Sequence, residues 1–176
     1  MSFFKVNNCI LSDQDYIVFN KRIYNSLYMK VLLLDNLRSM QNVGAIFRNC
    51  DGAGFEKIYL CGYTPTPPRN EISKTALSAQ NTIDWEYYND AKEVITLLKK
   101  QDYKVYSIEL DEKAIDYKQL FQNTPKNICF VLWNEVKWVD KNLLDISDEI
   151  VMIPMLGNKE SLNVSVAAGV VMYATV

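Results

Sequence analysis

The 176-residue chain contains no histidine. This excludes a Ser-His-Asp or Cys-His nucleophile system, and it excludes histidine as a general base. The four cysteines, at positions 9, 50, 61 and 129, form no C-x-x-C pair, which argues against a zinc site of the usual Cys and His spacing. We therefore expect no metal site, and any acid–base chemistry must use other side chains.

Long apolar stretches and glycine-rich phosphate loops are also missing. The longest apolar runs, such as residues 31–34, are a few residues long, whereas a membrane-spanning helix needs about 20. The first eight residues lack the features of a signal peptide, so we expect a cytoplasmic protein with no membrane partner. The six glycines make neither G-x-G-x-x-G nor G-x-x-x-x-G-K-S/T, which disfavours a dinucleotide-binding Rossmann domain and a P-loop NTPase.

The net charge does not suggest a nucleic-acid-binding protein. The chain has 19 basic and 21 acidic side chains, a formal charge of −2 and a sequence pI near 5.2. The distribution is uneven, because residues 1–50 carry six basic and three acidic side chains while residues 51–176 carry 13 and 18. A local basic patch and ordinary surface scatter both remain open.

Apolar runs alternate with helical periodicity, which predicts an α/β fold with a largely parallel sheet flanked by helices. Residues 1–29 are interpreted as a short N-terminal extension, helical from residue 13, and residues 30–176 as one domain. The expected strands are 31–34, 57–61, 84–88 at a sheet edge, 103–110, 128–132 and 150–155. The expected helices are 41–53, 71–81, one ending at 100 and capped by Asn89 or Asp90, 141–148, and 163–176.

Ligand sites in such sheets lie beyond the carboxyl ends of the strands. Those ends are predicted at 35–36, 61–64, Leu110, 133–135 and 155–157. Polar and loop-forming residues gather there, but every loop of this kind has such residues.

One of these ends is followed by an unusual segment at residues 42–48. Asn42 is a plausible helix N-cap, and Gly44 and Ala45 would let the start of the helix pack closely. Arg48 lies roughly 9 Å further along the same helix. Its guanidinium can hold a phosphate through two hydrogen bonds, although a solvated or salt-bridged surface arginine explains it equally simply.

Two further segments stand out. Asn134 and Glu135 follow a buried strand at Trp133, where polar groups can point into a crevice or merely form a turn. Residues 153–169 pass from a strand broken at Pro154 through a polar loop into a helix of small residues, capped by Ser161 or Asn163.

Together the three segments resemble the sequence motifs of the SpoU (TrmH-like) RNA 2′-O-ribose methyltransferases of the SPOUT superfamily. The first resembles N-x-G-A-x-x-R, formed by Asn42, Gly44, Ala45 and Arg48. The third resembles I-P-M-x-G-x-x-x-S-L-N-V-S-V-A-A, matched over residues 153–168. The resemblance extends over roughly residues 30–176, including the G-Y-T-P and K-T-A-L stretches between the first two motifs.

The resemblance implies an α/β knot, in which the C-terminal segment threads through a loop, and a homodimer whose active site draws on both subunits. It also implies S-adenosyl-L-methionine (AdoMet) as methyl donor and tRNA or rRNA as substrate. By position, the cofactor would be held around Trp133, Asn134, Ile153, Met155 and Leu162. Arg48, Asn42, Ser161 and Asn163 match the residues around the acceptor ribose.

The family's proposed base is the arginine at the position of Arg48. Because an arginine side chain normally stays protonated, an electrostatic role towards phosphate and the developing alkoxide is the more conservative interpretation. Arg38, Arg48 and Arg69 are the candidate RNA-binding residues.

The second motif departs from the family pattern. Asn134 and Glu135 are kept, but Trp133, Val136 and Trp138 stand where glycines are expected. These side chains would narrow the cofactor pocket, or the indoles would stack on adenine or a base. The main alternative is therefore a catalytically inactive, dimeric SPOUT-fold RNA-binding protein, and a third is an unrelated small-molecule enzyme.

Overall fold

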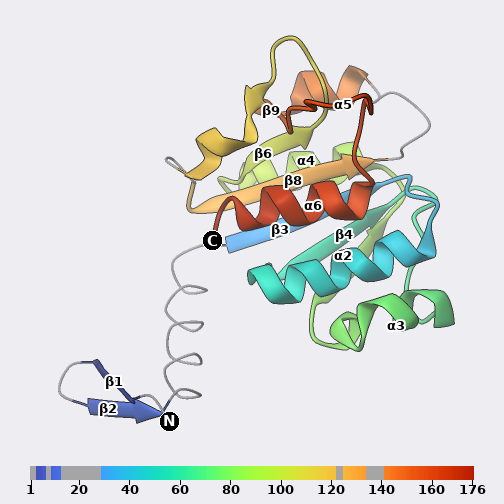
Figure 1. Ribbon diagram of the computed structural model, residues 1–176. Helices are drawn as coiled ribbons and strands as arrows, with labels where there is room; N and C mark the ends of the chain where they lie inside the picture. Colours follow the sequence, from blue (N-terminus) through green and yellow to red (C-terminus); the bar gives the residue numbers. More distant parts are fainter. Residues whose placement is uncertain (1–2, 7–8, 13–28, 122–124, 134–140) are drawn as a thin grey trace.

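The computed structural model describes residues 3–6, 9–12, 29–121, 125–133 and 141–176 (Figure 1). Its main sheet has seven strands, and every neighbouring pair is parallel. This confirms the predicted α/β class with a parallel sheet. In order across the sheet the strands are β5 (Asp84–Tyr88), β4 (Lys57–Cys61), β3 (Met29–Asp35), β8 (Asn127–Trp133), β6 (Lys104–Ile108), β9 (Glu149–Met152) and β7 (Ile115–Asp116).

Both faces of this sheet are covered. Alternate side chains of a strand point to opposite faces, so Leu32 and Leu34 of β3 join one core cluster while Val31 and Leu33 join another. Figure 1 shows the resulting three layers. The first face is covered by α2 (Met40–Ala53), α3 (Asn70–Ala76) and α6 (Val164–Tyr173), and the second by α4 (Ala91–Lys100) and α5 (Lys141–Ile146).

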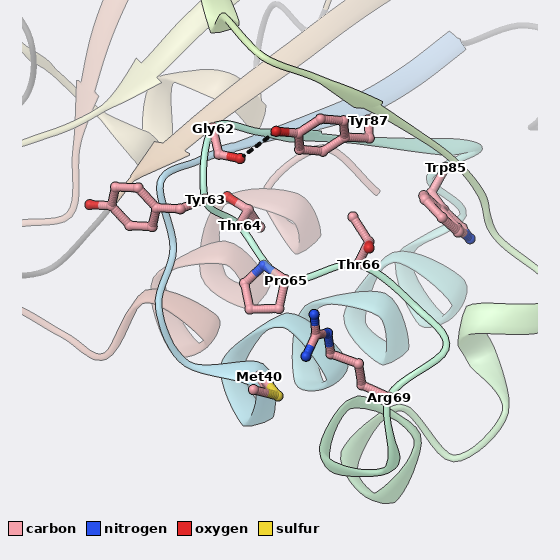
Figure 2. Close-up of a pocket in the computed structure, with 9 residues that line it drawn as sticks. All are labelled: Met40, Gly62, Tyr63, Thr64, Pro65, Thr66, Arg69, Trp85 and Tyr87. Atoms are coloured by element: carbon pink, nitrogen blue, oxygen red, sulfur yellow. Dashed lines mark hydrogen bonds between the residues drawn. The ribbon is translucent and has the colours of Figure 1, made fainter.

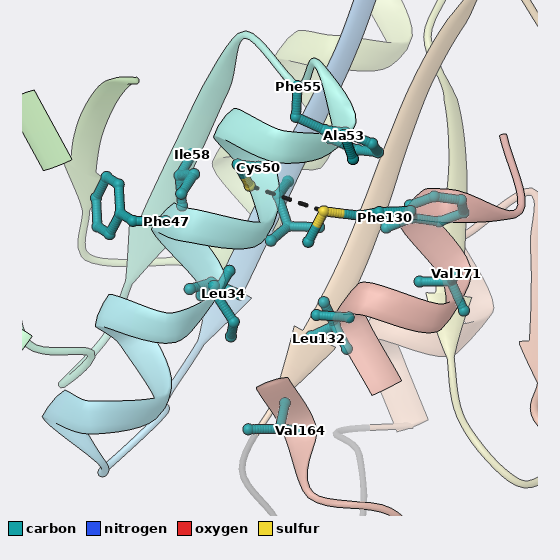
Figure 3. Packing of buried hydrophobic residues seen from close by; sticks show 14 of the residues in the cluster. Leu34, Phe47, Cys50, Ala53, Phe55, Ile58, Phe130, Leu132, Val164 and Val171 are labelled. Atoms are coloured by element: carbon teal, nitrogen blue, oxygen red, sulfur yellow. Dashed lines mark hydrogen bonds between the residues drawn. The ribbon is translucent and has the colours of Figure 1, made fainter. Parts of the chain in front are cut away.

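The larger cluster joins α2 and α6 to the middle of the sheet. Figure 3 shows Phe47 of α2, Phe130 of β8 and Val171 of α6 in this cluster. Each of the three is fully buried, and burying an aromatic or aliphatic side chain of this kind contributes about 1.5–3 kcal/mol. The packing therefore fixes α2 and α6 on the same face of the sheet.

The N-cap of α2 is Ser39, not Asn42 as predicted. The Ser39 hydroxyl accepts a hydrogen bond from the backbone N–H of Asn42, so Asn42 lies inside the first turn. The sequence offers two good capping residues three positions apart, and the helix begins after the first. The predicted C-cap is confirmed, because Gly54 adopts a left-handed conformation with φ of 72°.

The helix expected over 71–81 is two elements, α3 and the 3₁₀ turn η1 (Ala79–Asn81). Leu77 and Ser78 between them have φ of 50° and 76°. Two successive residues of positive φ cannot continue a right-handed helix, so the chain turns there.

The remaining helices and strands lie close to their predicted ranges. Asp90 caps α4 and Asn163 caps α6, each through its side-chain oxygen. The strand expected over 150–155 ends earlier, because Pro154 has no N–H to offer the sheet. β7 and the 3₁₀ turn η2 (Tyr117–Phe121) were not predicted.

The start of the chain differs from the expectation in part. β1 (Phe3–Val6) and β2 (Cys9–Ser12) form an antiparallel pair where no strand was predicted. The helix predicted from residue 13 lies outside the described residues, apart from Met29, which begins β3. No helix in the described part of the chain has the length and apolar character needed to cross a membrane.

The C-terminal segment is tied to β3 by a buried lysine. Lys30 is 1% exposed, and its Nζ donates a hydrogen bond to the carbonyl of Thr175. Burial lowers the pKa of Lys30 from 10.5 to about 8. This contact brings the end of the chain against β3, and the knot implied by the family resemblance stays a prediction.

Candidate active site

The carboxyl ends of β3 and β8 mark the point where the chain changes direction across the sheet. The helix after β3 covers the first face, whereas the helix after β8 covers the second. Asp35 and Trp133, the last residues of the two strands, lie opposite each other in register. In parallel α/β sheets a ligand crevice forms at such a switch point.

The first and third motifs meet at this edge of the sheet. The side-chain amide of Asn163, the N-cap of α6, donates to Oδ1 of Asn42 at 3.2 Å. The same Asn163 accepts a hydrogen bond from the backbone N–H of Ser165 at 2.9 Å. Two of the four predicted catalytic residues are therefore in direct contact, although they are 121 positions apart in the chain.

A second contact fixes the two helices that carry these motifs. The Asn49 side chain on α2 donates to the carbonyl of Ser165 on α6 at 2.8 Å. A Cβ at Gly169 would lie 3.3 Å from the Asn49 amide nitrogen, so a small residue is needed there for the close approach. Sequence reasoning missed Asn49, because only the tertiary structure brings it to the first turn of α6.

The α2 helix is also held from its other side by α3. A Cβ on Gly44 would lie 2.1 Å from the Thr75 hydroxyl oxygen and 2.3 Å from the Ile72 carbonyl. The Thr75 hydroxyl donates to the carbonyl of Gln41 at 3.0 Å. The predicted close packing at Gly44 is confirmed, and it clamps the turn that carries Asn42.

Arg48 and Ser161 are both exposed, Arg48 on α2 and Ser161 just before α6. Among the described residues, no carboxylate lies within salt-bridge distance of the Arg48 guanidinium. Its charge is therefore not neutralised by a described acidic side chain and is open to an anionic ligand.

The loop between β9 and α6 contains three predicted cofactor residues. Ile153 packs against the larger core cluster, while Met155 and Leu162 are half-buried. Among the described residues, the backbone groups of 153–162 form no hydrogen bonds with one another or with other segments. Polar backbone groups at a site need partners, so this loop can offer donors and acceptors to a ligand.

For Trp133 the sequence leaves two expectations open, a narrowed cofactor pocket or an indole that stacks on adenine or a base. The ring is 8% exposed and packs in the core cluster on the second face. Its Nε1 donates to Oε2 of Glu109 at 3.1 Å. The ring therefore forms a wall of the site instead of an open stacking surface. Asn134, the remaining predicted cofactor residue, lies outside the described residues.

Glu109 is a candidate site residue that the sequence reasoning missed. It directly follows β6, and its carboxyl group is held by the Trp133 indole. Burial raises the pKa of this carboxyl, more than the Trp133 hydrogen bond lowers it. Its position at the carboxyl end of a strand is the signal that would have found it.

The loops after β3 and β4 are bound to each other. The Thr64 hydroxyl donates to the Leu34 carbonyl at 3.1 Å and accepts from the Leu37 backbone N–H at 3.1 Å. Arg38, a predicted RNA-binding residue, places its guanidinium 5.9 Å from the centre of the Tyr63 ring. Arg69 is exposed at the end of the second loop. Both arginines therefore lie near the same edge as Asn42.

Three of the four cysteines are poor nucleophiles. Cys50, Cys61 and Cys129 are buried and free of disulfides. Burial raises the pKa of all three thiols, that of Cys61 to about 12. Among the described residues, no cluster of three potential metal ligands is present.

The sequence matches the family model for the SpoU rRNA Methylase family over residues 29–173. The chain belongs to this family. The predicted family resemblance and enzyme class are thereby confirmed. This SpoU-family protein is an RNA methyltransferase with an α/β fold.

The chain is also similar to named relatives in sequence and to solved structures in fold. The tRNA (guanosine(18)-2′-O)-methyltransferase of Thermus thermophilus is 32% identical over 143 residues, which are 81% of this chain and 71% of the relative. The crystal structure of the A. aeolicus TrmH/SpoU tRNA modifying enzyme has a TM-score of 0.73 at 22% identity, covering 90% of this chain and 81% of its own. The AdoMet-bound rRNA methyltransferase from Sinorhizobium meliloti has a TM-score of 0.76 at 22% identity, covering 86% and 59%.

Proposed function

We propose that this SpoU-family protein transfers a methyl group from AdoMet to a ribose 2′-hydroxyl of tRNA or rRNA in the cytoplasm. The observation that carries the proposal is the hydrogen bond between Asn42 and Asn163, which assembles the first and third motifs at the switch point of the sheet. The 32% identical Thermus thermophilus relative makes tRNA the first substrate to test.

The residues around the switch point fit the cofactor. The backbone groups of 153–162 are free of partners among the described residues, and Ile153, Met155 and Leu162 supply apolar walls. Glu109 adds a carboxyl group that can accept hydrogen bonds from a ribose diol. AdoMet supplies an activated methyl group on a sulfonium sulfur, so correct positioning can provide much of the rate acceleration.

The protein's own residues act on the acceptor ribose. Arg48 holds the phosphate next to the reacting nucleotide and stabilises the negative charge that develops on the 2′-oxygen. We prefer this role to that of a base, because a guanidinium keeps its protons at neutral pH. Asn42, Asn163 and Ser161 orient the hydroxyl and the loop before α6.

A homodimer is supported by the outward face of α6. Val166 and Tyr173 on this helix are 51% and 52% exposed, and Val176 just after it is 60% exposed. Leu156 in the loop before α6 is 99% exposed. Large apolar side chains that are exposed on a helix and on the segments next to it are typical of a protein–protein interface.

A catalytically inactive RNA-binding protein is the second candidate. It is favoured by one observation: a tryptophan stands at position 133 where the family has glycine, and its buried ring occupies one wall of the expected pocket. Such a protein would bind RNA without binding the cofactor.

Two measurements separate these candidates. The first is calorimetric titration of the purified protein with AdoMet and with S-adenosylhomocysteine. Micromolar binding supports the enzyme, whereas no binding at millimolar ligand by a folded protein favours the inactive alternative. The second is transfer of a radiolabelled methyl group to tRNA and rRNA from cells that lack 2′-O-methylation, followed by nuclease digestion to identify the methylated nucleotide.

A further inference from the structure

A groove of about 610 Å³ lies beside the candidate active site and is not used by the reaction described above. It is formed by the loop after β4, the neighbouring strand β5 and the first residue of α2 (Figure 2). Its volume is within the range of about 300–1,000 Å³ for ligand pockets. The residue from α2 is Met40, two positions before the Asn42 that contacts Asn163. The groove is therefore continuous with the first turn of the active-site helix.

One wall of the groove is aromatic. Trp85 and Tyr87 are two positions apart on β5 and share one face of the strand, and Figure 2 shows both rings along the groove. Tyr87 is 47% exposed, and its hydroxyl donates to the Gly62 carbonyl at 2.9 Å, which orients the ring. Trp85 is half-buried, because part of its ring packs against the larger core cluster. The exposed Tyr87 ring and the accessible part of Trp85 together offer a surface on which a flat group can stack.

The opposite side of the groove is positively charged. Arg69 reaches from the end of the loop, and in Figure 2 its guanidinium points towards Thr66. At one end of the groove, the Arg38 guanidinium lies 5.9 Å from the centre of the Tyr63 ring.

In the part of the chain that the structure describes, no acidic side chain lines the groove. Glu86, which lies between Trp85 and Tyr87 in the sequence, is instead paired with Lys57 at 2.7 Å. The groove thus combines the exposed rings of Tyr63 and Tyr87 and the half-buried ring of Trp85 with basic groups, in a protein whose formal net charge is −2.

We infer that this groove binds an unpaired nucleotide of the RNA substrate, next to the nucleotide that is methylated. The base stacks on Trp85 and Tyr87, and Arg69 contacts the adjoining phosphate. Aromatic rings with a neighbouring arginine are the usual means of holding single-stranded RNA, because every base has a flat face and every nucleotide a phosphate. The inference rests on the proposed function, since it assigns the groove to the RNA of that reaction.

The test compares the RNA affinity of variants that lose an aromatic ring of the groove with that of variants that keep it. Fluorescently labelled oligouridine and oligoadenosine of ten nucleotides are titrated with wild-type protein, and the affinity is read from anisotropy. A duplex of equal length serves as the comparison. We expect the single strands to bind more tightly than the duplex. Trp85→Leu and Tyr87→Leu should each weaken single-strand binding about 5- to 100-fold, the range for one stacked base.

Matched variants separate stacking from folding. Tyr87→Phe keeps the ring and should bind close to wild type. Tyr88→Leu removes a ring from the opposite face of the same strand, where Tyr88 packs against the second core cluster, and should leave RNA affinity unchanged. Arg69→Gln should reduce both affinity and its salt dependence. Lys100→Gln, at the last residue of α4, should do neither.

The outcomes distinguish this inference from the proposed function. If wild-type protein binds no single-stranded RNA, or if Trp85→Leu and Tyr87→Leu bind as wild type does, the groove is not an RNA site. Equal losses in Tyr87→Leu and Tyr88→Leu also overturn it, because the effect would then be on the strand. AdoMet binding by the groove variants is measured in parallel. If the groove variants keep their AdoMet affinity and lose RNA affinity, both proposals are supported. If RNA binding depends on the groove but no protein binds AdoMet, only the methyltransferase proposal is overturned.

Discussion

The side-chain amide of Asn163 donates a hydrogen bond to Oδ1 of Asn42 at 3.2 Å. Asn163 ends the loop between β9 and α6, and Asn42 lies in the first turn of the helix after β3. This contact joins the two motifs by which the chain resembles its family, and it holds Asn163 against the helix that carries both Asn42 and Arg48.

The asparagine pair should be energetically coupled. Asn42→Ala, Asn163→Ala and the double variant form a cycle, with stability measured by urea unfolding. We expect a coupling of about 0.5–1.5 kcal/mol, the net contribution of one hydrogen bond. Asn163→Ala alone should cost about 1 kcal/mol more, because it also removes the N-cap of α6. Pairing Asn42→Ala with Asp90→Ala, which removes the distant α4 cap, should be additive. Full additivity of the asparagine pair would contradict the contact.

Arg48 should be needed for turnover and not for cofactor binding. Arg48→Ala should lower kcat by about 100-fold or more, because it removes a positive charge aimed at the developing alkoxide. Arg48→Lys should recover part of the activity, since it keeps the charge and loses the two-pronged geometry. Calorimetry should give the wild-type AdoMet affinity for both variants. An equal loss of AdoMet affinity in Arg48→Ala would refute the role, and Lys100→Ala serves as a surface control.

Replacing Glu109 should weaken cofactor binding while leaving the protein folded. Glu109→Gln should weaken AdoMet binding about tenfold, because an uncharged amide is a weaker acceptor for ribose hydroxyls. The fold should survive, since the amide oxygen can still accept from Trp133.

The pH dependence of stability provides a second readout for Glu109. Burial raises the pKa of Glu109 above its ordinary value of 4.5. The folded state therefore holds this proton more tightly than the unfolded chain, and the stability gained below pH 4.5 is lost as pH rises through the raised pKa. Thermal unfolding should show Glu109→Gln gaining stability relative to wild type from acidic to neutral pH. A constant difference across that range would be inconsistent with a buried carboxyl.

A charge on the outward face of α6 should disrupt the proposed dimer. Val166→Glu should shift the protein from dimer to monomer in light scattering coupled to size-exclusion chromatography, because an unpaired carboxylate would be buried in the interface. Leu97→Glu places the same charge at an exposed position on α4 and should leave the mass unchanged. A monomeric wild-type protein at high concentration would rule the dimer out.

Gly44 should resist even the smallest substitution. Alanine favours helix, yet its Cβ at position 44 would lie 2.3 Å from the Ile72 backbone carbonyl, which cannot move independently of α3. Gly44→Ala should therefore destabilise the protein by about 1–3 kcal/mol in urea unfolding. Gly157→Ala, where an added Cβ meets nothing within 4 Å, should be close to neutral. Similar stabilities for the two variants would argue against the close packing of α2 and α3.

The family, the α/β class and most element positions were accessible from the sequence. Continuous apolar runs such as 31–34 signal strands buried on both faces, and the polar loop of residues 153–163 carries a long, specific motif. The sequence predicts less well where two local conformations are equally compatible with the residues. Ser39 and Asn42 are both good caps, and nothing in the residues alone predicts that Leu77 and Ser78 adopt positive φ.

The class of enzyme and the residue types available to it can therefore be read from the chain alone, because the absence of histidine and the three motifs are properties of the sequence. Which of those residues meet depends instead on how the chain folds. The contacts of Asn163 with Asn42 and of Trp133 with Glu109 depend on the order of strands in the sheet and on the packing of α6 against α2. The groove beside Met40 likewise exists because β5 pairs with β4 at the edge of the sheet, a long-range pairing that no local pattern in the sequence encodes.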